Sequence, residues 1–131
     1  CTAASTVDVL PDIGLPTPMV AQSGILTCDH LMVTLDGSAS TGTGNLDYQW
    51  LDANQMSLST AEQIDLNTPG IYTLVVSDVN NGCTAEMTVE VLQDIEAPVA
   101  DAGMGATLTC AQDQYQLNGG NSSLGNEFTY Q

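Results

Sequence analysis

Hydrophobic and polar residues alternate along four stretches of the chain. Apolar or aromatic side chains occupy every second position in 31–35, 46–50, 72–76 and 85–91. A period of two is typical of β-strands that bury one face in a core. In the last stretch the intervening positions are threonines and glutamates, which suit a solvent-facing side. No stretch of ten or more residues carries the 3.6-residue period of a helix, so we expect an all-β fold.

Turn-forming residues separate these stretches. Glycine, asparagine, proline, serine and threonine gather at 36–38, 41–45, 67–70 and 80–82, where they favour chain reversals. Six to eight short strands, spaced by turns over roughly 80 residues, are typical of an antiparallel β-sandwich.

The chain repeats itself at a fixed spacing, in which position 1 corresponds to position 83. The segment CTAASTVDVL at 1–10 returns as CTAEMTVEVL at 83–92, and 18 of the 49 overlapping positions are identical. The repeat predicts the last strand of a preceding repeat at 1–12, a complete sandwich at 16–93 and the first half of a following repeat at 98–131. The incomplete parts have two explanations. Either the polypeptide continues on both sides, which we favour, or neighbouring copies complete them.

Charge excludes several classes of function. The 131 residues include no lysine or arginine and sixteen carboxylates, which gives a net charge of −16. Nucleic-acid binding through a basic surface is therefore excluded, as is electrostatic attachment to an anionic membrane. No apolar stretch approaches the roughly 18 residues of a membrane-spanning helix, so we expect no membrane insertion. Apolar residues make up 43% of the chain, enough to form a core.

Four cysteines, Cys1, Cys28, Cys83 and Cys110, follow the same repeat. Within the complete repeat, the sequence predicts a disulfide between Cys28 and Cys83, with Cys1 and Cys110 paired outside it. Closing a loop of that length stabilises a fold by roughly 3–4 kcal/mol in the chain-entropy model. The alternatives are four free thiols or a bridge between Cys1 and Cys28. Disulfides indicate an oxidising, extracellular environment.

Five short motifs resemble those of a known family. The motifs LTC (26–28), LDGSAS (35–40), YQW (48–50), PGIYTL (69–74) and DVNNGC (78–83) look like the PKD-like, immunoglobulin-type repeats of very large secreted bacterial surface proteins. The resemblance implies seven-stranded sandwiches strung end to end on the cell surface, as stalks, adhesins or filaments. Their partners would be adjacent repeats of the same polypeptide or neighbouring copies in a fibre. A Gly-Asp-Gly turn that often follows the tryptophan in this family is absent after Trp50.

Acidic residues recur where one repeat passes into the next. The candidates for a calcium site are Asp12, Asp78, Asp94, Glu96 and Asp101. Calcium takes six to eight oxygen ligands in irregular geometry, and an ion at a junction would stiffen the linker. The alternative is solvated carboxylates in turns. We expect no other cofactor.

Aromatic residues offer a sugar-binding platform or a core. Tyr48, Trp50 and Tyr72 share the parity of the buried positions, which favours the core. Tyr72 is also placed to form a tyrosine corner, with its hydroxyl bonded to the backbone upstream.

Catalytic groups are scarce. His30 is the single histidine, and we expect it on the surface. Glu86 and Glu90 lie roughly 13 Å apart along a strand, too far for a glycosidase pair. Asn121 begins an N-glycosylation sequon. We therefore expect a non-enzymatic structural repeat of an extracellular filament or adhesin stalk, the alternative being a carbohydrate- or protein-binding module.

Overall fold

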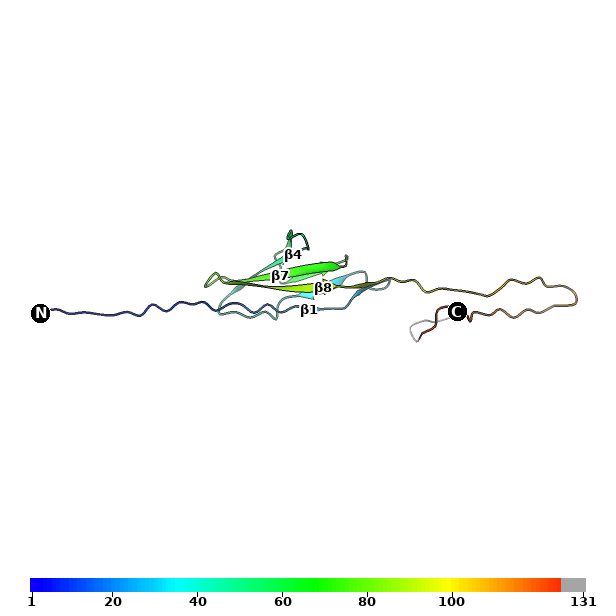
Figure 1. The fold of residues 1–131 in the computed structure, drawn as a ribbon, viewed down its shortest axis with the longest axis horizontal. Coiled ribbons are helices and arrows are strands. Elements are labelled where there is room, and N and C mark those ends of the chain that lie inside the picture. The colour runs from blue at the N-terminus through cyan, green and yellow to red at the C-terminus, as the bar shows by residue number, and fades with distance from the viewer. Residues whose placement is uncertain (126–131) are drawn as a thin grey trace. The chain divides into compact units, whose positions relative to one another are not determined.

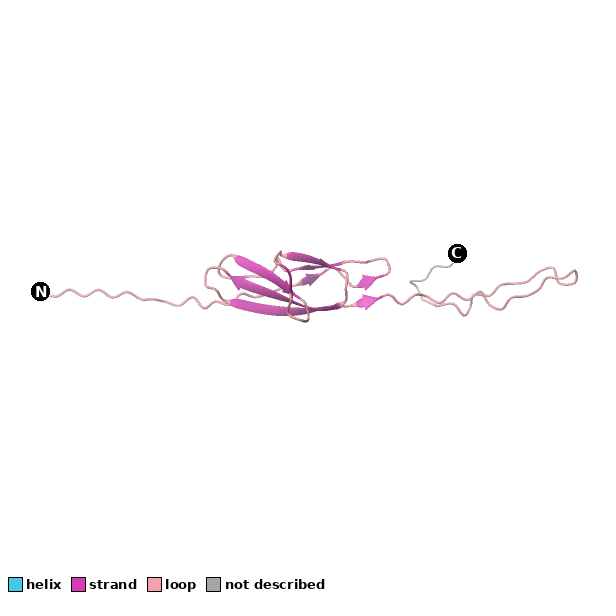
Figure 2. Cartoon of the chain, turned by 90° about the horizontal axis from the view of Figure 1, so that it is seen from above, coloured by secondary structure: helices cyan, strands magenta, loops and turns pink. Residues whose placement is uncertain are grey.

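The computed structural model describes residues 1–125 and divides the chain into two compact units, Cys1–Ile95 and Glu96–Gln131. All the strands of the described residues lie in the first unit (Figure 2). They are β1 (Ala21–Gln22), β2 (Leu26–Thr27), β3 (Val33–Asp36), β4 (Leu46–Leu51), β5 (Ser57–Ser59), β6 (Gln63–Leu66), β7 (Gly70–Asp78), β8 (Thr84–Val91) and β9 (Gln93–Asp94). Between residues 1 and 125 there is no helix long and apolar enough to cross a membrane.

Two antiparallel sheets form the first unit (Figure 1). One has the order β1-β3-β6 and the other the order β5-β4-β7-β8, while β2 and β9 form a separate parallel pair. The core draws its buried apolar residues from both sheets. The expected all-β fold is therefore confirmed, and the first unit is a β-sandwich.

The core forms around Trp50. Its side chain is completely buried, and its Nε1–H donates a hydrogen bond of 3.0 Å to the carbonyl of Ala61. The remaining buried apolar residues are Leu26, Val33, Leu35, Leu66, Tyr72, Leu74, Val76 and Val91. Core positions for Trp50 and Tyr72 are thus confirmed, with Tyr48 partly buried against them, and neither buried ring offers a platform for a sugar.

The tyrosine corner is also confirmed. The hydroxyl of Tyr72 donates a hydrogen bond of 2.9 Å to the carbonyl of Thr68, four residues upstream. The ring is 7% exposed. The contact fixes the turn at 67–70 to the start of β7 and satisfies a hydroxyl that burial would otherwise leave without a partner.

Three of the four alternating stretches coincide with strands β4, β7 and β8, and the fourth is correct only in part. Strand β3 begins at Val33, and Leu31 is 70% exposed. The cause lies upstream, where the hydroxyl of Thr27 accepts hydrogen bonds from the backbone N–H groups of Asp29 and His30. The Thr27 N–H donates to the His30 carbonyl. This tight turn delays the extended backbone until after Leu31.

The predicted disulfide between Cys28 and Cys83 is wrong, because the two residues lie at opposite ends of the sandwich. Cys83 precedes the first residue of β8, whereas β9, which follows β8, pairs with β2 and so reaches Cys28. The eight residues of β8 alone span roughly 25 Å, and a disulfide needs Cα atoms within about 7 Å. All four cysteines are free thiols; Cys83 is partly buried and the others are exposed.

In the second unit, Glu96–Gln131, local contacts match those at the equivalent positions of the first. The Ser122 hydroxyl accepts from the Asp101 N–H at 2.9 Å and donates to the Asp101 carbonyl at 3.0 Å. The Ser40 hydroxyl makes the same two contacts with Met19, at 3.0 and 3.3 Å. The hydroxyl of Thr109 accepts from the backbone N–H groups two and three positions later, as that of Thr27 does.

Candidate functional site

A buried carboxylate organises one end of the sandwich. Asp78, the last residue of β7, is completely buried. Its Oδ2 accepts hydrogen bonds from the Thr43 N–H (2.7 Å), the Thr43 hydroxyl (2.8 Å) and the Gly44 N–H (2.9 Å). Its Oδ1 accepts from the Asn80 N–H at 2.9 Å. We call Asp12, Thr43, Asp78 and Asn81 the Asp78 cluster.

These donors decide the ionisation of Asp78. The hydrogen bond from the Thr43 hydroxyl is the largest influence that lowers the pKa of this carboxyl, and the backbone N–H groups of Asn80, Gly44 and Thr43 act in the same direction. Desolvation raises the pKa but is outweighed. Asp78 is therefore a carboxylate at neutral pH, and it anchors the 42–44 turn to the end of β7.

The same cluster holds the segment that leads into the sandwich. The Asn81 Nδ2 donates to Asp12 Oδ1 at 3.2 Å and to the Gly14 carbonyl at 2.9 Å. The Asn81 Oδ1 accepts from the Cys83 N–H at 2.8 Å. One amide side chain thus joins residues 12–14 to the start of β8. Asn81 and Thr43 lie in segments read from the sequence only as turns.

The five calcium candidates do not share one location. Only Asp12 and Asp78 meet, around Thr43, and the Asp78 oxygens face N–H and O–H donors rather than open space. Asp94 lies in β9, at the opposite end of the sandwich, whereas Glu96 and Asp101 belong to the second unit. The described residues contain no group of three or more His, Cys, Asp or Glu arranged to hold a metal. Calcium binding stays a prediction.

A shallow cleft lies at the other end of the sandwich, beside β2. Its volume is about 170 Å³. His30, the single histidine, lines it and is exposed, so the surface position expected for this residue is confirmed. The residues that line it are Ser23, Gly24, Ile25, Thr27, His30, Met32 and Val33. The hydroxyls of Ser23 and Thr27 accept hydrogen bonds from backbone N–H groups, and the imidazole of His30 is a further polar group in the cleft.

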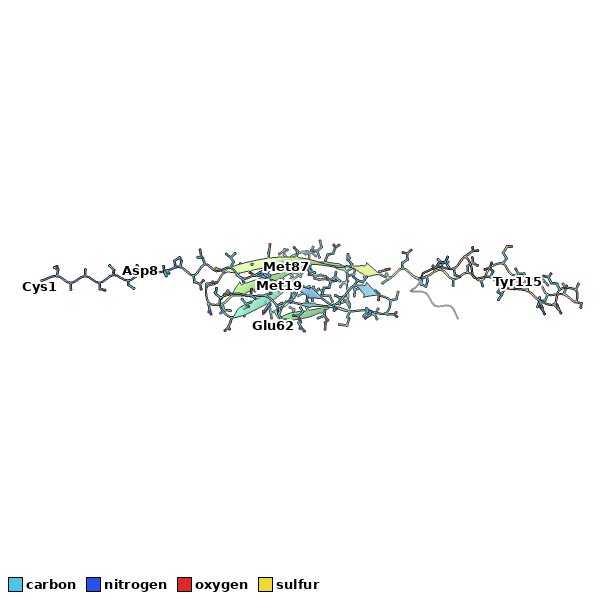
Figure 3. The ribbon with its side chains drawn as sticks, turned by 90° about the horizontal axis from the view of Figure 1, so that it is seen from below. Cys1, Asp8, Met19, Glu62, Met87 and Tyr115 are labelled. Carbon is cyan, nitrogen blue, oxygen red and sulfur yellow. The ribbon has the colours of Figure 1, made fainter. Side chains whose placement is uncertain are left out.

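The other candidate residues lie away from this cleft. Glu86 and Glu90 are exposed on β8, opposite Val75 and Ile71 of β7, as the alternation predicts. Asn121, in the second unit, is exposed, and its glycosylation stays a prediction. Figure 3 shows Met87 on β8, and Cys1 and Asp8 on the segment that precedes the sandwich.

No family model matches the chain, and no curated protein matches it. A solved structure does. It is described by the words "carbohydrate-binding modules from the beta-sandwich super family", and it superimposes with a TM-score of 0.51 at 22% sequence identity. The match covers 63% of this chain and 36% of that chain. The likeness is one of fold. It supports a β-sandwich domain for the first unit.

Proposed function

We propose that this chain is a non-enzymatic structural segment of a string of immunoglobulin-like β-sandwiches, in an extracellular filament or adhesin stalk. The observation that carries the proposal is the recurrence of the same contacts at equivalent positions of the repeat. The hydroxyls of Ser40 and Ser122 each clamp one backbone residue through both its N–H and its carbonyl. Such a clamp recurs at a fixed spacing when the same strand arrangement begins again.

A paired exchange of side chains supports this reading. A Cβ atom at Gly14 would lie 2.8 Å from the Thr43 methyl carbon, which is too close. In the next repeat the equivalent positions are Glu96 and Gly125. Glu96 adds a side chain where the first repeat has Gly14, and Gly125 lacks the side chain that Thr43 has. Such a compensating exchange is expected if the two positions face each other in both repeats.

Exposed apolar residues in the second unit also favour a string. Leu108 and Leu117 are 57% and 71% exposed, whereas their counterparts Leu26 and Leu35 are 4% and 0% exposed. In the first unit, Leu26 and Leu35 belong to a core cluster that also contains Trp50 of β4, Leu74 of β7 and Val91 of β8. We infer that residues 98–131, of which 126–131 lie outside the described residues, begin a following sandwich and that residues 1–12 are the last strand of a preceding one.

Other observations fit a mechanical rather than a catalytic role. The solved structure that resembles this fold is described as a binding module, and the tyrosine corner at Tyr72 is typical of immunoglobulin-like sandwiches. A net charge of −16 keeps such a string hydrated and opposes its collapse. A location outside the cell follows from the resemblance to secreted surface repeats.

Adding one repeat should add one sandwich domain that unfolds independently under load. We would insert a second copy of residues 13–94 directly after Asp94 and pull the extended chain from its ends in a reducing buffer. We expect two unfolding events, against one for the original chain. Each event should lengthen the chain by about 250 Å, because an unfolded chain extends by about 3.3–3.6 Å per residue and the folded sandwich is much shorter. A single event of doubled length, or no discrete event, would contradict the proposal.

A second candidate function is carbohydrate binding in the cleft beside β2. The likeness to carbohydrate-binding modules favours it. The small volume of the cleft, about 170 Å³, does not. Under the structural proposal, a glycan array probed with the whole chain shows no saturable binding. Saturable binding that His30→Ala abolishes, and that the exposed control Asn54→Ala retains, would establish the second candidate instead.

A further inference from the structure

Two asparagines are directly followed by glycine, at Asn81-Gly82 and Asn118-Gly119. In such a pair the backbone nitrogen of the glycine attacks the side-chain amide carbon of the asparagine, because glycine has no Cβ to obstruct the approach. A bond forms between that nitrogen and Cγ, the Cγ–Nδ2 bond breaks, and the proton of the nitrogen leaves with the amide as ammonia. Water then opens the cyclic imide to aspartate or isoaspartate.

The structure holds the attacking nitrogen of the first pair. The Gly82 N–H donates a hydrogen bond of 2.8 Å to the Asp78 carbonyl, and the Asp78 N–H donates one of 2.8 Å to the Cys83 carbonyl. Gly82 has a φ of 73°, which a residue without Cβ adopts at no steric cost. The turn between β7 and β8 is therefore closed by two backbone hydrogen bonds, one of which occupies the N–H that the reaction must deprotonate.

The side chain of the first pair is held as well. Asn81 is partly buried, and its Nδ2 donates to the Gly14 carbonyl at 2.9 Å and to Asp12 Oδ1 at 3.2 Å. Its Oδ1 accepts from the Cys83 N–H at 2.8 Å. Ring closure would require the amide to leave all three partners.

At the second pair neither group is restrained in this way. Asn118 is exposed, and its Oδ1 accepts from the Gly120 N–H at 2.9 Å. Among residues 1–125, neither the Asn118 Nδ2 nor the Gly119 N–H has a hydrogen-bond partner. The side chain therefore gives up a single hydrogen bond when it turns toward the glycine nitrogen.

We propose that Asn81 is a deamidation site that the folded sandwich protects and that unfolding exposes, whereas Asn118 reacts in the folded chain. The inference depends only on contacts local to each asparagine and stands apart from the proposed function. A carboxylate at position 81 would meet the Asp12 carboxylate and the Gly14 carbonyl with no N–H to offer either. Isoaspartate would also lengthen the backbone directly before β8. A single unfolding event would thus leave a covalent change that weakens the refolded Asp78 cluster.

Incubation of the whole chain at neutral pH, with and without urea, tests the proposal. A protease that cuts after acidic residues releases peptides from a chain without lysine or arginine, and mass spectrometry follows the conversion of each amide to an acid. Asn118 should react at similar rates in both samples. Asn81 should react at least about tenfold more slowly in the folded chain, which corresponds to a local opening free energy of about 1.4 kcal/mol.

Two results of this experiment would overturn the proposal. Equal rates at Asn81 with and without urea would show that the fold gives no protection. Equal slowing of Asn81 and Asn118 in the folded sample would show that the protection does not come from the contacts of Asn81.

A pair of variants tests the cause of the protection. Asp12→Ala removes one acceptor of the Asn81 amide, so deamidation at Asn81 should be faster in this folded variant than in the wild type. Asp8→Ala is the control, because Asp8 is exposed on the same leading segment and its loss changes the net charge equally (Figure 3). Equal rates at Asn81 in the two variants would overturn the assignment of protection to these hydrogen bonds.

A second pair of variants tests the consequence of the reaction. Asn81→Asp introduces the product directly and should lower the melting temperature of the sandwich. Asn118→Asp adds the same charge at an exposed position and should leave the melting temperature unchanged. Equal melting temperatures would show that deamidation at Asn81 does not weaken the fold.

Discussion

Trp50→Ala is expected to lower the free energy of unfolding of the first unit by about 3–5 kcal/mol. The indole is completely buried between the two sheets, and its Nε1–H satisfies the Ala61 carbonyl. Truncation leaves a cavity and an unpaired carbonyl. The total free energy of unfolding of a small domain is about 5–15 kcal/mol, so this loss is a large part of it. The melting temperature should therefore fall by at least about 12 °C. Urea and thermal unfolding followed by far-ultraviolet circular dichroism measure both quantities.

Met56→Ala is the matched control for the tryptophan variant. Met56 is 65% exposed in the loop between β4 and β5, so its truncation should change the unfolding free energy by no more than about 0.5 kcal/mol. If Trp50→Ala cost no more than this control, the indole would not be a core residue and the arrangement of the two sheets would be wrong.

Strands were predictable from the sequence where they are long and bury one face. Tyr72, Leu74 and Val76 are buried along β7, and of the positions next to them Ile71, Val75 and Ser77 are less buried, whereas Thr73 is buried as well. Strands β1, β2 and β5 contain only two or three residues each. So few residues show no period, and their extended conformation depends on partners elsewhere in the chain, such as Leu35 and Asp36 for β1.

The cysteine pairing could not be predicted from spacing. The repeat identified which residues are equivalent, but the separation of Cys28 and Cys83 along the chain does not say at which end of a strand each one lies. That depends on how the strands pair. Strand β8 begins directly after Cys83, where Thr84 pairs with Ser77, and it ends at the other end of β7, where Val91 pairs with Gly70. The parallel pairing of β2 with β9 then places Cys28 at the far end.

The Asp78 cluster was predictable only in part. The sequence singles out Asp78, but as a candidate calcium ligand. Its partners Thr43 and Gly44 lie far upstream in the sequence, in a glycine-rich turn whose proximity the sequence does not reveal. The contact arises because Leu46 pairs with Asp78 across β4 and β7, which brings the preceding turn over the end of β7.

Asp78→Asn is expected to destabilise the first unit strongly at neutral pH. An asparagine keeps one carbonyl oxygen, but its NH₂ group would face the backbone donors of Thr43, Gly44 or Asn80. Those N–H groups would lose an acceptor in a buried site. The melting temperature should fall well below that of Asp47→Asn, an exposed substitution on neighbouring β4 with the same change in net charge. Equal melting temperatures for the two variants would contradict a structural role for the carboxylate.

The pH dependence of this difference supplies a second, independent measurement. The hydrogen bond from Thr43 lowers the pKa of Asp78 in the folded state, so the unfolded chain binds the proton more readily than the folded one. The stabilisation from this group is therefore complete above the ordinary carboxyl range and is lost as the pH falls through the lowered folded-state pKa. The wild-type advantage over Asp78→Asn should shrink as the pH drops below about 4, because a protonated Asp78 also brings a donor to the site. Thermal unfolding of both proteins from pH 7 to pH 3 tests this, and an advantage that stayed constant across that range would show that ionisation of Asp78 contributes nothing to the fold.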